Sequence, residues 1–250
     1  MTEFYLGHVF KQLYERNELP IEEIAQLEWP FAGLFDGLQQ YASSPLAIHR
    51  VLQKDPLLFA QLITLMYKRD DRSPEPSHEG IDQKGRENLA HNARQVVDSW
   101  RLLPGLKDDG SLDEKELTEW VEAVRQKCAT TGHVTGGDLQ IAFMLARAPG
   151  DADGTWPHLA VRNLIERLNN DLIDEHIQMG IYNSRGGVSR GLADGGAQER
   201  ELADRYKKMS EAVKLKWPRT AAMLRSIANS YNRYAEHEDI SSELNDLRWN

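Results

Sequence analysis

The sequence contains a single cysteine, Cys128, among its 250 residues. One thiol cannot form a disulfide within the chain, so the composition excludes a disulfide-stapled fold and favours a reducing compartment. Long apolar runs are also missing, because the most apolar stretch, residues 56–67, is shorter than a membrane span and contains Gln61 and Thr64. The first residues lack the basic start and apolar core of a secretion signal. We therefore expect a cytoplasmic protein with no membrane partner.

Strand patterns are equally scarce. Apolar residues recur every three or four positions from the beginning, as in Phe10, Leu13 and Tyr14, which is the spacing of one helical face. Prolines such as Pro45 and Pro56 precede apolar helical runs, at positions where the missing N–H group has no cost. Hydrophobic residues at 40% and charged residues at 28% are typical of a globular chain. The sequence predicts an all-α fold of stacked antiparallel helices, either solenoid-like or an irregular bundle.

A polar segment with two prolines, between Arg69 and Gly85, interrupts these helical patterns. Such composition is typical of an exposed loop or linker. It predicts an N-terminal helical subdomain over residues 1–70, a linker over residues 71–85 and a main helical domain over residues 86–250.

The most distinctive stretch runs from Ile181 to Ala235. It begins with a loop in which five of the eleven positions 186–196 are glycine, a density that opposes helix formation. Two helical seams follow, and Pro218 separates them because proline cannot continue the preceding helix. Their apolar positions are Leu202, Tyr206, Met209 and Val213, then Ala221, Leu224, Ala228, Tyr231 and Ala235. The pattern predicts a long C-terminal antiparallel helical hairpin.

This stretch is also unusually basic. Residues 181–234 contain eleven basic and five acidic side chains, a net charge of +6, whereas the whole chain carries −9. Such asymmetry indicates a partner surface. The candidate binding residues for a partner or a phosphate are Arg185, Arg190, Arg200, Arg205, Arg219, Arg225 and Arg233.

Two interpretations of these arginines compete. Arg185 and Arg190 lie among glycines whose N–H groups could form an anion nest before a helix N-terminus, which favours phosphate, although the pattern of a nucleotide P-loop is absent. Alternatively, Arg219, Arg225 and Arg233 pair with acidic helices elsewhere in the chain.

One segment matches a catalytic pattern. Residues 187–191 read G-x-S-x-G, the turn that presents the nucleophilic serine of hydrolases at the end of a strand. No strand is readable before Ser189, and the chain lacks the alternation of strands and helices on which such enzymes are built. We therefore predict no catalytic residue and no enzymatic activity.

Metal-ligand patterns fail in a similar way. Residues 107–116 resemble a calcium loop, but Lys107 would occupy a ligand position, where a cation repels the metal. Asp171, Glu175 and His176 cluster along one helix without a second histidine at ligand spacing. The sequence predicts no metal and no cofactor.

Residues 183–186, 195–200 and 217–231 resemble a helical domain found toward the C-terminal end of large, mostly uncharacterised bacterial proteins. Some of these proteins are thought to belong to phage-defence or other multidomain assemblies. Residues 55–59 and 100–120 are also similar, so the resemblance extends over most of the chain. It implies a scaffold module and brings no reaction and no catalytic residue.

Two functions follow as expectations. The first is a non-catalytic helical scaffold or protein-interaction module of a bacterial multidomain or multi-subunit system, whose basic hairpin contacts an acidic protein or neighbouring domain. The alternative is phosphate or nucleic-acid binding through the glycine- and arginine-rich loop and the hairpin, which would weaken steeply with salt.

Overall fold

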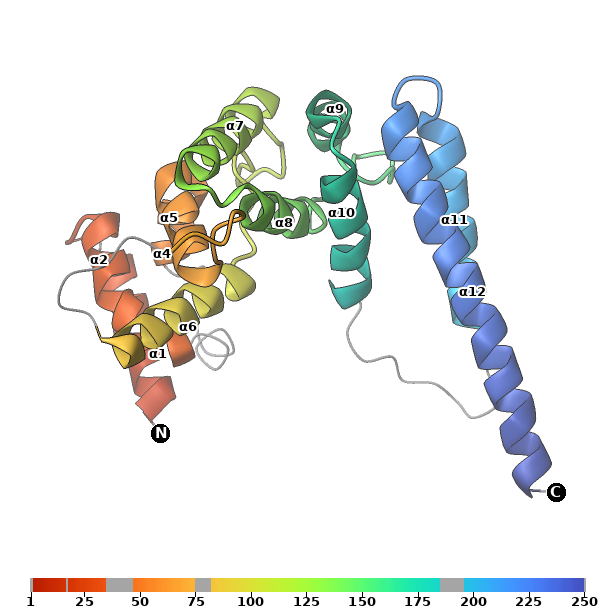
Figure 1. The fold of residues 1–250 in the computed structure, drawn as a ribbon, viewed down its shortest axis with the longest axis horizontal. Helices are drawn as coiled ribbons and strands as arrows, with labels where there is room; N and C mark the ends of the chain where they lie inside the picture. The colour runs from red at the N-terminus through yellow and green to blue at the C-terminus, as the bar shows by residue number, and fades with distance from the viewer. Residues whose placement is uncertain (1, 17, 35–46, 75–81, 185–195, 250) are drawn as a thin grey trace. The chain divides into compact units, whose positions relative to one another are not determined.

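The computed structural model describes residues 2–16, 18–34, 47–74, 82–184 and 196–249 (Figure 1). These ranges contain eleven α-helices, one short 3-10 helix and no strand beyond a single bridge between Leu106 and Leu112. The predicted all-α fold is therefore confirmed. None of the helices in the described ranges is both long and apolar enough to cross a membrane.

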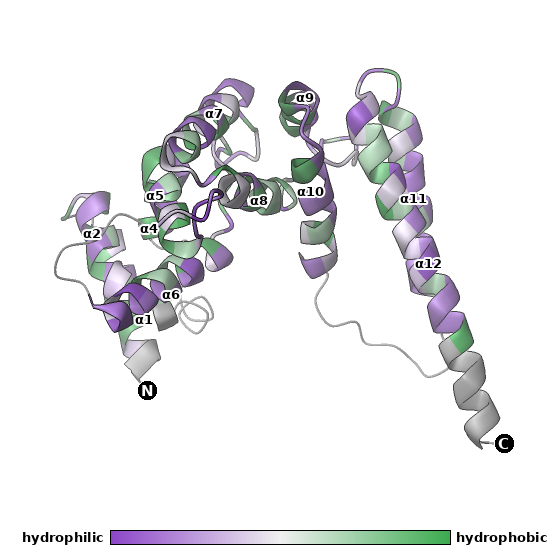
Figure 2. Ribbon diagram, viewed as in Figure 1, coloured by the Kyte–Doolittle hydropathy of each residue, from purple (hydrophilic) through white to green (hydrophobic). Residues whose placement is uncertain are grey.

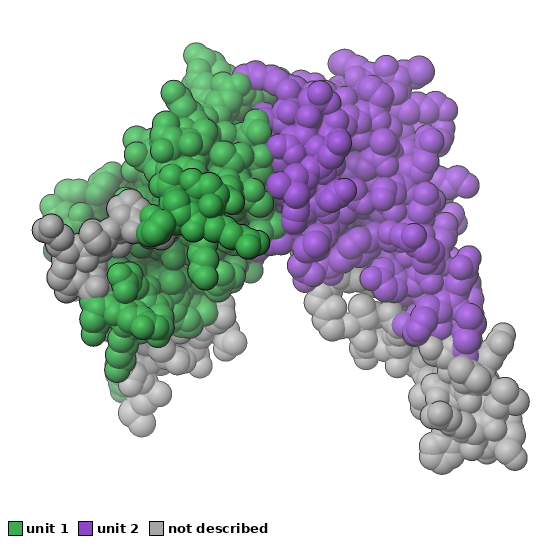
Figure 3. All heavy atoms as spheres, viewed as in Figure 1, with its two compact units in different colours: residues 1–141 green, residues 142–250 purple. Residues whose placement is uncertain are grey.

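The chain divides into two compact units, residues 1–141 and residues 142–250 (Figure 3). The division falls within helix α8 (Val134–Leu145). The sequence placed a linker over residues 71–85 instead, yet the helices on both sides of that segment, α5 (Pro56–Met66) and α6 (Gln83–Ser99), pack against each other. A polar segment with prolines thus connects two helices of one unit.

Unit 1 consists of paired helices whose apolar faces meet. Helix α5 packs on α6 and on α7 (Glu114–Thr131). Helix α2 (Ile21–Glu28) packs on α4 (Ala47–Lys54), and the 3-10 helix η1 (Trp29–Leu34) packs on α6. Helix α1 (Thr2–Arg16) packs on α2.

Three aromatic rings form the centre of unit 1. The ring centroid of Phe59 lies 5.4 Å from that of Trp100 and 4.9 Å from that of Trp120. Both indoles are buried, and their N–H groups donate to the carbonyls of His49 at 3.0 Å and Leu52 at 3.1 Å. Each tryptophan therefore adds a large apolar surface to the core without leaving its polar atom unsatisfied.

Unit 2 contains the end of α8 and four further helices. These are α9 (Leu159–Leu168), α10 (Asp171–Ser184), α11 (Ala197–Val213) and α12 (Pro218–Trp249). Helices α11 and α12 form the predicted hairpin, with apolar and polar residues alternating around both (Figure 2). Its buried seam includes Ala203, Val213, Leu224 and Ala228, and the Ser210 hydroxyl donates to the Ala221 carbonyl at 2.8 Å.

Candidate interaction surface on the C-terminal hairpin

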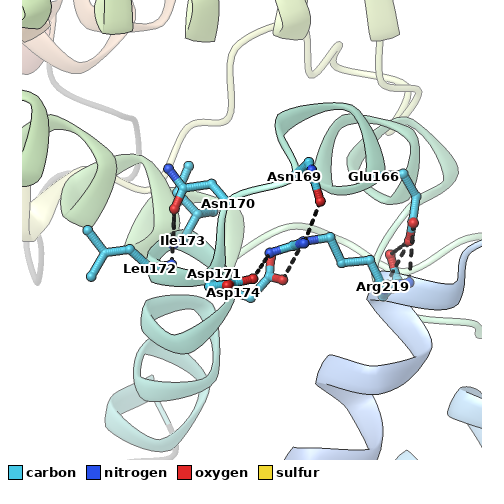
Figure 4. Close-up of polar contacts among 9 residues, drawn as sticks. Glu166, Asn169, Asn170, Asp171, Leu172, Ile173, Asp174 and Arg219 are labelled. Carbon is cyan, nitrogen blue, oxygen red and sulfur yellow. Dashed lines mark hydrogen bonds and ion pairs between the residues drawn. The ribbon is translucent and has the colours of Figure 1, made fainter.

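The hairpin turns at Trp217 and Pro218, where α12 begins. The carboxylate of Glu166, in α9, accepts hydrogen bonds from Arg219 N at 3.2 Å and from Thr220 N at 2.8 Å (Figure 4). The Thr220 hydroxyl donates to the same carboxylate at 3.0 Å. Since the first N–H groups of a helix have no partner within it, an acidic side chain there satisfies them and complements the helix dipole. Glu166 thereby ties the start of α12 to α9.

Arg219 forms the second part of this junction. Its guanidinium pairs with Asp171 and Asp174, reaching Asp174 Oδ2 at 2.6 Å, and donates to Asn169 Oδ1 at 2.6 Å (Figure 4). The side chains of Arg219 and Asp174 are only 19% and 15% exposed. Arg219, one of the seven predicted binding arginines, is therefore engaged by acidic residues of its own chain.

The electrostatics of Asp174 follow from its position. Burial raises the pKa of Asp174 to about 6, while the Arg219 guanidinium acts in the opposite direction. The free-energy cost of desolvating this carboxylate exceeds the electrostatic stabilisation that one cation supplies. Arg219 is thus the main group that stabilises the partly buried negative charge of Asp174.

Trp217 adds an aromatic contact to the turn. Its indole N–H donates to Asn163 Oδ1 at 2.7 Å, and the Arg162 guanidinium lies over its ring at 4.4 Å from the centroid. The Lys216 ammonium lies 4.6 Å from the same ring. These contacts fix the entry of α12 on α9, which is a structural role for the Trp-Pro pair.

At the other end of the hairpin, the arginine side chains have different partners. Arg200 pairs with Asp239, with the closer nitrogen 2.6 Å from Oδ2, and Gly196 N donates to the same carboxylate at 2.8 Å. Arg233 donates to Ser230 Oγ at 2.9 Å. The positive charge at this end is therefore accompanied by acidic side chains.

A different arrangement surrounds Glu211, near the turn. Two cations contact this one carboxylate, because Lys214 Nζ bonds to Oε2 and a terminal nitrogen of Arg225 lies 3.4 Å from Oε1. The neighbouring Lys214 lowers the pKa of Glu211, so this carboxyl is ionised at neutral pH. Even so, the net charge of the hairpin near its turn is positive.

Charge is therefore segregated along the hairpin. Residues 205–225, at the turn end, contain seven basic side chains and one acidic side chain. Residues 196–204 and 226–240, at the open end, contain two basic and six acidic side chains. Apart from Arg219, the basic residues at the turn end are exposed, and we call them the turn-end patch: Arg205, Lys207, Lys208, Lys214, Lys216 and Arg225.

The predicted arginines therefore lie in different environments. Arg205 and Arg225 belong to the turn-end patch, and Arg205 also lines a shallow hollow of about 390 Å³ on α11. Arg185 and Arg190, the arginines of the predicted anion nest, lie outside the described residues. The lysines of the turn-end patch were counted in the charge of this stretch but not among the predicted binding residues.

Aromatic contacts that the sequence did not indicate hold the hairpin to α10. Tyr182 donates from its hydroxyl to the Ile227 carbonyl at 3.2 Å, and its ring lies 5.1 Å from that of Tyr231. Tyr231 stacks in turn on Tyr206 at 5.8 Å with an interplanar angle of 6°. Sequence spacing places Tyr206 and Tyr231 on the inner faces of the two helices, but nothing in it pairs them with Tyr182.

Catalytic and metal chemistry gain no further support from the geometry. Ser189 lies outside the described residues. No group of three or more potential metal ligands gathers in the described part of the chain. Burial raises the pKa of the Cys128 thiol to about 11, so a reactive thiolate is disfavoured at neutral pH.

Comparison with known proteins gives no family assignment. No family model matches the chain, and comparisons with characterised proteins and with solved structures find no similar chain.

Proposed function

We propose that this chain is a non-catalytic helical interaction module whose turn-end patch binds an acidic surface of a protein partner or neighbouring domain. The observation that carries the proposal is the segregation of charge along the hairpin, with the cations exposed at the turn and acidic residues concentrated at the open end. Complementary potentials orient partners and accelerate their encounter. The resemblance to helical domains of bacterial assemblies agrees with this role, and the cytoplasmic location and bacterial origin stay predictions.

An apolar side chain lies within the turn-end patch. Leu215, between Lys214 and Lys216, is 95% exposed. Burial of a leucine side chain against a partner stabilises a complex by about 2 kcal/mol. The tip of the hairpin therefore combines electrostatic attraction with an apolar contact.

Nucleic acid is the alternative partner. The exposed lysines and Arg225 could contact phosphates, but the chain carries −9 overall and the open end of the same hairpin is acidic. A polyanion that follows the hairpin beyond its turn would meet like charge. A compact acidic protein surface meets only the basic end, so we favour a protein.

The test uses the full chain as bait in extract of its source cells. The variant Lys207→Glu/Lys208→Glu reverses two charges in the turn-end patch, and Lys115→Glu/Lys127→Glu reverses two exposed charges on α7 as a matched control. Reversal of two exposed contacts weakens binding by about tenfold or more. We expect an acidic protein that the wild type and the control retain and that the patch variant loses, with retention falling at high salt.

Two results would contradict the proposal. If the patch variant and the control retain the same proteins in the same amounts, the patch is not the contact surface. If the patch variant instead loses copurified RNA or DNA, the nucleic-acid alternative replaces the proposal.

A further inference from the structure

A cavity of about 660 Å³ opens in unit 1, lined by the end of α5, part of α6 and the end of α7. Its walls combine apolar, polar and cationic side chains, and no carboxylate of the described residues belongs to its lining. The residues that define its chemistry are Leu65, Tyr67 and Leu89, with Lys68, Arg69 and Arg86. This volume lies in the range of small-molecule sites.

Hydrogen bonds fix one wall of this cavity. After α5 ends, Asp70 N donates to the Gly132 carbonyl at 2.7 Å, and Thr135 N donates to Asp70 Oδ2 at 3.2 Å. Gln140 Nε2 donates to the Tyr67 hydroxyl at 2.7 Å. The segment that carries three lining residues is therefore attached to the turn between α7 and α8, so the wall is formed before any ligand arrives.

Arg69 is the most firmly placed cation. Its guanidinium lies against Gly132, which has a φ of +75°, and a Cβ at that glycine would be 3.1 Å from a terminal nitrogen. The Arg69 side chain is 26% exposed, and its Nε lies 3.5 Å from Asp71, whose side chain is 62% exposed. A pair this open to water is weak, so Asp71 offsets little of the positive potential in the cavity.

We propose that this cavity binds a small organic anion with an apolar body, such as an aromatic or branched aliphatic carboxylate or phosphate monoester. The apolar walls remove the hydrocarbon part of such a ligand from water, and three cations in a half-enclosed cleft concentrate positive potential on its charged group. Neither inorganic phosphate nor a neutral hydrocarbon uses both features. The site is separate from the turn-end patch and does not depend on the function proposed for it.

The experiment measures binding of 1-naphthyl phosphate to the full chain by titration calorimetry, with 1-naphthol and inorganic phosphate as comparison probes. The variant Lys68→Gln/Arg86→Gln removes two exposed cations of the lining. The control Lys84→Gln/Lys127→Gln removes two exposed cations of α6 and α7 outside it. We expect 1-naphthyl phosphate to bind most tightly and its Kd to rise about tenfold in the lining variant, with less than about twofold change in the control.

Backbone amide shifts in NMR spectra localise the binding. We expect 1-naphthyl phosphate to shift amides around Leu65, Arg69 and Leu89. The proposal is overturned if 1-naphthyl phosphate does not bind, if 1-naphthol binds equally well, or if the two double variants weaken binding to the same extent. Circular dichroism of both variants confirms that they are folded.

Discussion

Single side chains decide what the hairpin arginines do. Arg219 and Arg225 are the same residue type on one helix, six positions apart, yet Arg219 is 19% exposed against Asp171 and Asp174, whereas Arg225 is 57% exposed beside Glu211. Their sequence positions alone are compatible with intramolecular pairing and with partner binding for both. The difference depends on which face of α12 meets α10, and that is a tertiary property that local spacing does not contain.

We predict that Arg219→Gln destabilises unit 2 by about 2 kcal/mol, because it leaves Asp174 partly buried without its cation. The loss is larger at pH 8 than at pH 5, since the pKa of Asp174 is raised to about 6 and rises further without Arg219. Hydrogen exchange of α10 and α12 amides measures this effect. Arg225→Gln is the control, with a change within about 0.5 kcal/mol for its exposed pair. Equal effects of the two substitutions would contradict the assignment.

A second prediction concerns Glu28, which is 2% exposed and accepts from Ala47 N at 3.0 Å and Ile48 N at 2.8 Å. Burial raises the pKa of Glu28 to about 7 from 4.5. Between these values the folded state holds a proton that the unfolded state has released, so the free energy of unfolding falls as pH rises. Relative to Glu28→Gln, wild type should lose about 3 kcal/mol between pH 4.5 and 8 in urea denaturation. A constant difference across this range would refute the shift.

The pKa of His49, in helix α4, is shifted in the opposite direction. Burial lowers the pKa of His49 to about 4 from 6.5, so the folded state keeps it neutral where the unfolded state is protonated. Its contribution to the free energy of unfolding is therefore lost as pH falls from 6.5 towards 4. The two groups oppose each other in wild type, and for this reason the Glu28 effect is measured as a difference from its own variant.

Among the elements, the hairpin was predicted well. Pro218 was expected at the start of the second helix, and the apolar seam residues Val213, Leu224, Ala228 and Ala235 are buried as predicted. Spacing and proline chemistry are local, so the sequence contains them. The cap at the start of α12 comes from Glu166, more than fifty residues away, and no local pattern announces such a partner.

The two hairpin helices approach each other closely at Gly196. A Cβ at Gly196 would lie 2.5 Å from Ala235 Cα, so a side chain at this position forces the helices apart. We expect Gly196→Val to destabilise the hairpin by about 1–3 kcal/mol through overpacking. Hydrogen exchange at the open end measures it. Ala197→Val, one residue further on and exposed, carries the same β-branched cost without the clash. Similar exchange rates in both variants would show that the contact is not restrictive.

For the molecule as a whole, composition predicted the fold class but not the grouping of helices. The polar residues 71–85 suggested a boundary, whereas the structure divides the chain at Ile141 and packs α5 on α6. Polarity shows that a segment is exposed, but not whether the helices on its two sides share a core. The cavity of unit 1 was also missed, since Lys68, Arg69 and Arg86 converge only after α6 folds back.

The exposed positive charge of the hairpin is concentrated near its turn. A chain with a net charge of −9 exposes six basic side chains and one leucine around the turn of a single hairpin. Attraction between such a patch and an acidic partner is screened within about 8 Å at physiological ionic strength, so it acts only at close range. The contact is therefore expected at the turn itself and nowhere along the acidic open end.

Photo-crosslinking in the source cells tests this central claim most directly. A photoreactive amino acid replaces Lys208 in the turn-end patch or, in a matched chain, Arg233 at the acidic end. We expect a crosslinked acidic protein from position 208 and none from position 233. Equal crosslinking from both positions, or crosslinks from position 208 to nucleic acid alone, would contradict the account.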